Sequence, residues 1–180
     1  RKSYEILKSL VDDLGRKAKG EAYESFSETL KLIGAAKLAG YIPDKSPSGR
    51  RLISCDDFWA DLDEETEALN RDLVDRALIE SIAQAYRGIV DFDDQIYMST
   101  LFGGAFPRFP LVLVDEAQDL SSINHAMLEK LVTQRIIAVG DPYQPIYAFR
   151  GAMSTSMATL REKFAMKEMH RVGDKFKHVT

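Results

Sequence analysis

The sequence predicts an α/β protein in which an all-helical part precedes a part that contains a parallel sheet. Apolar residues recur at three- and four-residue spacing through roughly the first 88 of the 180 residues, as they do in amphipathic helices. After Gly88 the pattern changes to two short apolar runs, Leu111–Val114 and the segment RIIAVGD at 135–141, with a helical pattern between them. Such strands are typical of a parallel sheet covered on both faces. We therefore expect two domains, 1–88 and 89–180.

The first part is expected to form helices over 3–19, 21–38, a short stretch through Trp59, and 64–87. The side chains expected to face the interior are Tyr4, Leu7, Leu10, Val11 and Leu14, then Tyr23, Phe26, Leu30 and Ile33, then Leu69, Leu73, Leu78, Ile82 and Tyr86. Gly40 and Pro43 end the second helix, and Asp56 or Asp57 is expected to cap the short one. Residues 42–51 are predicted to form an exposed loop.

In the second part, VDFDDQIYMSTLF at 90–102 is typical of a capped helix, and Pro107 and Pro110 enclose a loop before the first strand. The segment SINHAMLEKLV at 122–132 predicts the helix between the two strands. The sheet would therefore be built from strand, helix and strand in that order.

Composition limits the class of protein. A hydrophobic content of 45% is enough for one large core or two small ones, and no apolar run is long enough for a membrane span. The one cysteine, Cys55, excludes an internal disulfide and predicts an intracellular, cytoplasmic protein with a bland thiol. The net charge of -4 argues against a uniformly basic nucleic-acid surface. Residue 1 is Arg, so we expect an excerpt or a processed product of something longer.

Polar residues follow both predicted strands. Asp115 and Glu116 come where the first strand ends, and Gly140 and Asp141 come where the second ends. Because ligands of open parallel sheets bind at the carboxyl ends of the strands, both clusters should meet at one edge. There Asp115 can hold Mg²⁺ and Glu116 can orient and deprotonate a water. The alternative is that Asp115 caps the next helix and Glu116 is solvated surface.

A second cluster, VGDPYQPIYAFRGA, follows at 139–152. Gln144 can hydrogen-bond a terminal phosphate or the water that attacks it. Tyr147 and Phe149, next to Arg150, can stack unpaired bases and hold their backbone. The alternative for the two aromatic residues is ordinary packing in a core.

The segments LVLVDEAQDLS and IIAVGDPYQPIYAFRGA resemble motifs II and III of the UvrD/Rep-like superfamily 1 DNA helicases. VDFDDQI at 90–96 is similar to the segment that precedes motif II, and MKEMHRVGDKF at 166–176 more weakly resembles motif IV. The resemblance covers about residues 91–176. It implies a partial RecA-like P-loop NTPase core, preceded by the all-helical insertion subdomain that these enzymes carry, although the helical part has no motif of its own.

By this resemblance the cofactors are ATP and Mg²⁺. Asp115, with Glu116 beside it, would hold the metal, and Glu116 would also be the catalytic base. Gln144 would sense the γ-phosphate, which Arg171 would contact in the closed state. Gln118, Gly140 and Asp141 would belong to the nucleotide side, with Gln118 and Asp119 linking it to the DNA side. Tyr147, Phe149 and Arg150 would bind single-stranded DNA, Phe149 standing where many members have Trp.

The phosphate-binding loop Gly-x-x-x-x-Gly-Lys-Ser/Thr of such enzymes is absent from this sequence. GRKAKGE at 15–21 has the glycine spacing but ends in Gly-Glu and is predicted to follow a helix, so we reject it. The 180 residues alone are therefore expected to be inactive and to need the remainder of a helicase, which would act on single-stranded DNA and duplex junctions. The alternatives are an ATP-independent module that binds single-stranded DNA or protein, and a metal-dependent nuclease built on Asp115, Glu116 and Asp141.

Overall fold

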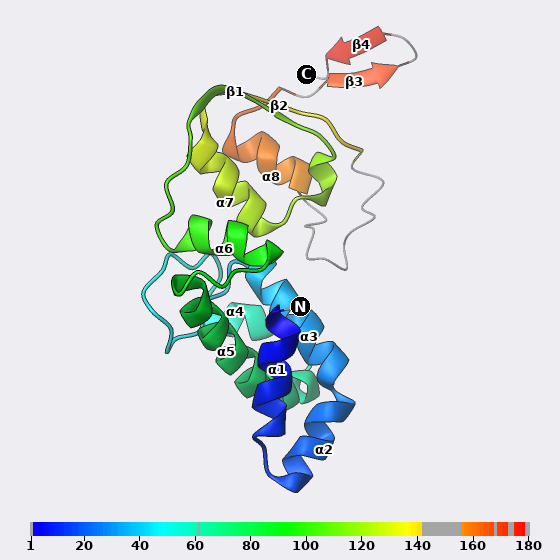
Figure 1. Ribbon diagram of the computed structural model, residues 1–180. Coiled ribbons are helices and arrows are strands. Elements are labelled where there is room, and N and C mark those ends of the chain that lie inside the picture. The colour runs from blue at the N-terminus through cyan, green and yellow to red at the C-terminus, as the bar shows by residue number, and fades with distance from the viewer. Residues whose placement is uncertain (1, 61, 142–155, 168, 173–174, 179–180) are drawn as a thin grey trace. The chain divides into compact units, whose positions relative to one another are not determined.

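The computed structural model describes residues 2–60, 62–141, 156–167, 169–172 and 175–178, the last two ranges through their backbone only. It contains helices and a small parallel sheet, and its contacts divide it into two compact units (Figure 1). The first unit comprises the described residues up to Phe106 together with Ser122–Asn124, and the second comprises the rest. The assignment of 1–88 and 89–180 as domains remains a prediction.

In the first unit every regular element among the described residues is a helix. The helices are α1 (Lys2–Asp12), α2 (Arg16–Glu24), α3 (Phe26–Ala39), α4 (Cys55–Ala60), α5 (Glu64–Tyr86) and α6 (Phe92–Leu101). In the second unit the elements are β1 (Phe109–Val114), the 3₁₀ turn η1 (Ala117–Asp119), α7 (Ser122–Leu131, whose first three residues group with the first unit), β2 (Val132–Ala138), α8 (Ser156–Lys163), β3 (Met169–Val172) and β4 (Lys175–His178). No described helix is long and apolar enough to cross a membrane.

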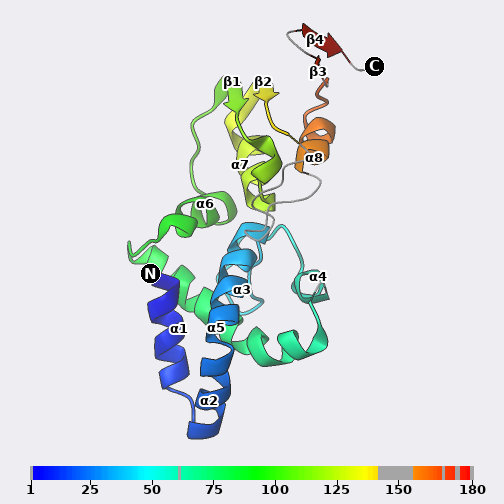
Figure 2. The same ribbon diagram turned by 90° about the vertical axis from the view of Figure 1, so that its right-hand side faces the viewer.

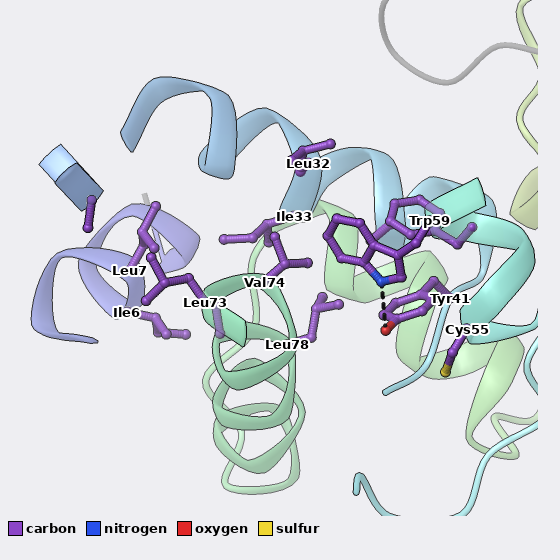
Figure 3. Close-up of a cluster of buried hydrophobic side chains, with 14 of the residues drawn as sticks. Ile6, Leu7, Leu32, Ile33, Tyr41, Cys55, Trp59, Leu73, Val74 and Leu78 are labelled. Carbon is purple, nitrogen blue, oxygen red and sulfur yellow. Dashed lines mark hydrogen bonds between the residues drawn. The ribbon is translucent and has the colours of Figure 1, made fainter. Parts of the chain in front are cut away.

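The core of the first unit lies between α1, α3 and α5, with α4 at one end. Its buried side chains include Ile6, Leu7, Ile33, Trp59, Leu73, Val74 and Leu78 (Figure 3). Trp59 Nε1 donates to the Tyr41 hydroxyl at 3.2 Å, and this hydroxyl donates to Asp75 at 2.6 Å, so the polar atoms of the buried rings are paired. Cys55 is buried beside them, and burial raises the pKa of its thiol, which agrees with a bland role.

Three features of the predicted helices are wrong. The expected helix over 3–19 ends at Asp12, and the extended Gly15 precedes a separate helix, α2, that begins at Arg16. The expected helix over 21–38 is interrupted at Ser25, between the end of α2 and the start of α3. The short helix is capped by Ser54, whose Oγ accepts from Asp57 N at 3.0 Å, and not by Asp56 or Asp57. The end of the second helix is confirmed, since Gly40 closes α3 in the left-handed conformation.

Four side chains predicted to face the interior are exposed instead. Tyr4 is 45% exposed, Tyr23 43%, Leu69 50% and Tyr86 60%. Tyr4 and Tyr23 both pack against the ring of Phe26 at the surface, with centroid distances of 5.3 and 5.9 Å. Aromatic contact thus takes the place of burial for these two residues.

A buried charged cluster holds the start of α6, the segment that precedes β1. Asp91 caps the helix and forms a reciprocal capping box with Asp94, as the sequence predicts for a capped helix. The Asp94 carboxylate also forms salt bridges with Lys37 Nζ of α3 at 2.7 Å and with Lys2 Nζ of α1 at 2.6 Å. Ser81 of α5 donates to the same carboxylate at 3.3 Å. The acidic residues of VDFDDQI therefore tie α6 to three other helices.

The sheet of the second unit consists of β1 and β2, which pair in parallel as expected, with Leu113 opposite Ile137. Side chains alternate between the two faces. Val112, Val114, Ile136 and Ala138 pack with Leu128 of α7 and Leu160 of α8. The two helices lie beside the strands (Figure 2). On the other face Leu111, Leu113, Ile137 and Val139 are 49%, 71%, 53% and 62% exposed. The expectation of a sheet covered on both faces is therefore wrong for the described residues.

Candidate functional site

The candidate site begins where β1 ends. Asp115 and Glu116 are both exposed directly after Val114, and Glu116 N donates to Asp115 Oδ1 at 3.0 Å. Glu116 has φ 50° and ψ 42°, in the left-handed region that residues other than glycine adopt at a cost. This conformation turns the chain from the strand into η1. Strain of this kind is concentrated at functional sites, so the acidic pair is a candidate for chemistry.

The side chain of Gln118 connects the ends of the two strands. Its Nε2 donates to Glu116 Oε2 at 2.7 Å, and its Oε1 accepts from Asp141 N at 3.0 Å. Gln118 is 5% exposed, so this amide is fixed in a mostly dry place. Gln118 therefore links the carboxylate of the catalytic candidate Glu116 to the backbone of Asp141, in the turn that follows β2.

The backbone makes the same connection. Val139 N donates to Val114 O at 2.8 Å, and Ala117 N donates to Val139 O at 2.9 Å. At Gly140 a Cβ atom would lie 2.4 Å from Gln118 Oε1 and 3.0 Å from Ala117 N, so a larger residue would require the Gln118 amide to move. The prediction that the two polar clusters meet at one edge of the sheet is confirmed.

Below this edge lies a buried pair that sequence reasoning missed. Ser156 Oγ, at the start of α8, donates to Ala117 O at 2.6 Å and lies 3.0 Å from His125 Nε2 of α7. Burial, with Lys163 nearby, lowers the pKa of His125. His125 and Ser156 are 31 residues apart in the sequence, so no local pattern indicates that they are in contact.

Asp119, expected to link two sites, keeps Oδ1 buried without a hydrogen-bond partner among the described residues.

The acidic residues of this edge suit a largely hydrated Mg²⁺ ion better than a metal ion held entirely by protein ligands. Mg²⁺ keeps several waters and takes one or two carboxylates, and Asp115 offers an exposed carboxylate for this purpose. Within the described ranges no group of three or more His, Cys, Asp or Glu residues could hold a metal by itself. A nuclease centre of Asp115, Glu116 and Asp141 therefore has no support in the described geometry.

The remaining predicted residues cannot be compared with the site. Gln144, Tyr147, Phe149 and Arg150 lie outside the described residues. Arg171 lies in β3, where its backbone pairs with Phe176 of β4 in an antiparallel hairpin that the sequence pattern did not predict. Its role toward a phosphate remains a prediction.

An α/β unit with polar turns gathered at the carboxyl edge of a parallel sheet belongs to the class that binds ligands at this edge. The sequence profile of the UvrD/REP helicase N-terminal domain matches residues 5–165. The chain therefore belongs to the UvrD/REP helicase family.

Three relatives give the same result. The chain is similar to the RecBCD enzyme subunit RecB of Mycolicibacterium smegmatis, with 30% identity over 173 residues, covering 82% of this chain and 14% of the relative. It is 28% identical over 132 residues to a probable DNA helicase II homolog of Mycoplasma genitalium, covering 67% of this chain and 19% of the relative. It is 38% identical over 77 residues to one subunit of the ATP-dependent helicase/nuclease of Natranaerobius thermophilus, covering 36% and 6%. The chain thus spans less than a fifth of each of these relatives, and no solved structure matches it significantly.

Proposed function

We propose that this chain is part of an ATP-dependent DNA helicase that moves along single-stranded DNA and unwinds duplexes by hydrolysing ATP. In this proposal it supplies the acidic half of the ATP site, within a RecA-like core, and the helices before it form an insertion subdomain. The observation that carries the proposal is the bridge from Glu116 through Gln118 to Asp141 N, with donor–acceptor distances of 2.7 and 3.0 Å. Membership of the helicase family supports it.

Each residue of the edge has a defined task in the proposed reaction. Asp115 would hold Mg²⁺, which would neutralise charge on the phosphate oxygens. Glu116 would orient the attacking water and accept its proton. The bond from Gln118 occupies Oε2 of Glu116, which leaves Oε1 to face the water. A base fixed in this way needs little reorganisation when the water attacks.

The phosphate loop and the second motor domain would come from other parts of the parent protein. The sequence has no Gly-x-x-x-x-Gly-Lys-Ser/Thr, and GRKAKG lies at the start of α2, so it is not a strand-to-helix phosphate loop. The exposed face of β1 and β2 is available for the rest of the motor domain to cover. Gln144 and Arg171 are proposed to contact the γ-phosphate, and Tyr147, Phe149 and Arg150 to contact the DNA strand.

The proposal is tested by the DNA-stimulated ATPase of the intact protein. Glu116→Gln keeps the shape of the side chain and an acceptor but removes the base, so turnover should fall at least about 100-fold. Glu129→Gln is the matched control, because Glu129 is an exposed carboxylate of α7 that pairs with Lys163. This control should retain its turnover.

Two results would count against the proposal. One is an intact wild-type protein without DNA-stimulated ATP hydrolysis, and the other is a Glu116→Gln variant that turns over like the control. If wild type binds single-stranded DNA without hydrolysis, and Phe149→Ala weakens this binding, the ATP-independent module is the correct function.

A further inference from the structure

Ala117, between Glu116 and Gln118, is fixed through both of the peptide groups that it joins. Its N–H donates to Val139 O at the end of β2, at 2.9 Å. Its carbonyl accepts from Ser156 Oγ at 2.6 Å, and Ala117 itself is completely buried. Because Ala117 links the proposed base to the glutamine that holds it, the orientation of these two peptide groups sets the position of both side chains.

The hydrogen atoms in this cluster can be assigned from the geometry. A serine hydroxyl has one proton, and Ser156 uses it toward Ala117 O. The contact of 3.0 Å between Ser156 Oγ and His125 Nε2 must then be donated by the histidine. His125 is therefore protonated on Nε2, and no described residue offers a hydrogen bond to its buried Nδ1.

Ser156 stands at the start of α8, where a serine commonly caps its own helix. Its described hydrogen bonds instead join His125 of α7 to the Ala117 carbonyl, so the hydroxyl serves the turn after β1. His125 and Ser156 are each 1% exposed, and removal of either partner would leave a buried polar atom unpaired. These hydrogen bonds lead to the candidate site, because the carbonyl that accepts from Ser156 belongs to Ala117, the residue after Glu116.

We infer that His125 and Ser156 are positioning residues for Glu116: His125 orients the Ser156 hydroxyl, which fixes the Ala117 carbonyl and through it the proposed catalytic carboxylate. This inference rests on the proposed function. Through the same hydrogen bonds, a movement of the start of α8, which directly follows residues 142–155, would change the position of Glu116 in the proposed ATP site. No contact with nucleotide is assigned to either residue.

The test uses the intact protein and two variants with matched partners. Ser156→Ala removes the donor to Ala117 O. Its control is Thr133→Val, which also removes a hydroxyl-to-carbonyl bond, the exposed one from Thr133 Oγ1 to Phe109 O at 2.9 Å, at the opposite end of the same sheet. His125→Asn removes the donor at Nε2, whereas His125→Gln places an amide N–H near that position.

Ser156→Ala and His125→Asn should lower kcat for ATP about 5- to 10-fold, as expected for the loss of one buried hydrogen bond that positions a base, with KM for ATP within about twofold. Thr133→Val and His125→Gln should keep kcat close to that of wild type. The double variant Ser156→Ala/His125→Asn should be no slower than Ser156→Ala, because the two residues act in one chain of bonds. Hydrogen exchange should become faster in peptides covering 115–120 and unchanged elsewhere in the second unit.

The inference is overturned if Ser156→Ala keeps the wild-type kcat, or if the two substitutions are additive. It is also overturned if exchange rises throughout the second unit, since this would show general destabilisation. Absence of ATPase in the wild type would instead overturn the proposed function. Hydrogen exchange at 115–120 would then decide by itself whether His125 and Ser156 fix this turn. Loss of activity in Glu116→Gln with no effect of Ser156→Ala would remove this inference alone.

Discussion

At the scale of single residues, the proposed base is held by its own backbone conformation and by two neighbouring residues. Glu116 adopts a left-handed conformation, Gln118 holds one of its carboxylate oxygens, and Gly140 gives Gln118 the space to do so. The identities of Asp115 and Glu116 as candidates were predictable from their place after an apolar strand. The need for glycine at 140 was not, because it depends on a side chain 22 positions earlier in the chain.

Gly140→Ala should inactivate the proposed site while the helical unit stays folded. A Cβ atom 2.4 Å from Gln118 Oε1 would displace the amide from Asp141 N and release Glu116. Because a small misplacement of a catalytic group is costly, we expect DNA-stimulated ATPase to fall about 10- to 100-fold.

The matched control is Gly34→Ala in α3, where an added Cβ meets nothing within 4 Å. This change should leave ATPase intact and raise the free energy of unfolding by about 0.5–1 kcal/mol, as for glycine in a helix interior. Wild-type ATPase in Gly140→Ala would show that the contact between Gly140 and Gln118 does not matter for turnover.

At the scale of elements, the long amphipathic helices were predictable and their ends were less so. The period of apolar residues identified α5, and Leu73, Leu78 and Ile82 are buried as expected. The same pattern placed Leu69 and Tyr86 inside, but helical periodicity does not show how far a neighbouring element extends along the helix. The capping box of α6 has a local signature, whereas its lysine partners come from α1 and α3 and have none.

Asp94→Asn should strongly destabilise the helical unit. Asp94 and Lys37 have side chains that are 1% exposed. The substitution removes the carboxylate that pairs with Lys2 and leaves Lys37 with the more distant Asp91, at 3.3 Å. We expect a loss of about 3 kcal/mol or more in the free energy of unfolding, measured by denaturant titration. Asp93→Asn is the control, because Asp93 is exposed on the same turn and should change stability by less than about 0.5 kcal/mol.

The same cluster predicts a dependence on pH. Burial acts to raise the pKa of Asp94, but hydrogen bonds from Lys2 and Lys37 outweigh it and hold the pKa below the ordinary value of 3.8. A carboxylate with a lowered pKa stabilises the folded state above its unfolded value, and this contribution is lost as the pH falls through the lower, folded value. Stability should therefore drop in acid below about pH 3.8, and Asp94→Asn should remove this part of the drop. An identical acid profile in Asp94→Asn would contradict this account.

At the scale of the whole molecule, the chain has two units with separate cores and a sheet that is covered on one face. Leu113 and Val139 are exposed by 71% and 62%, which is unusual for strands so uniformly apolar. The apolar composition of both strands predicts a sheet covered on both faces, but among the described residues only the face that packs against α7 and α8 is covered. The alignment with the RecB relative covers 14% of that protein's length. We propose the ATPase activity for this chain acting together with further motor elements.

We propose that Glu116 performs the chemical step of ATP hydrolysis in the intact protein and contributes little to nucleotide affinity. Single-turnover hydrolysis and nucleotide binding, measured side by side for wild type and Glu116→Gln with single-stranded DNA present, separate these two contributions. We predict that the variant binds ATP with a Kd within about threefold of wild type and hydrolyses it at least about 100-fold more slowly. Hydrolysis at the wild-type rate by a variant that binds ATP normally would contradict the claim.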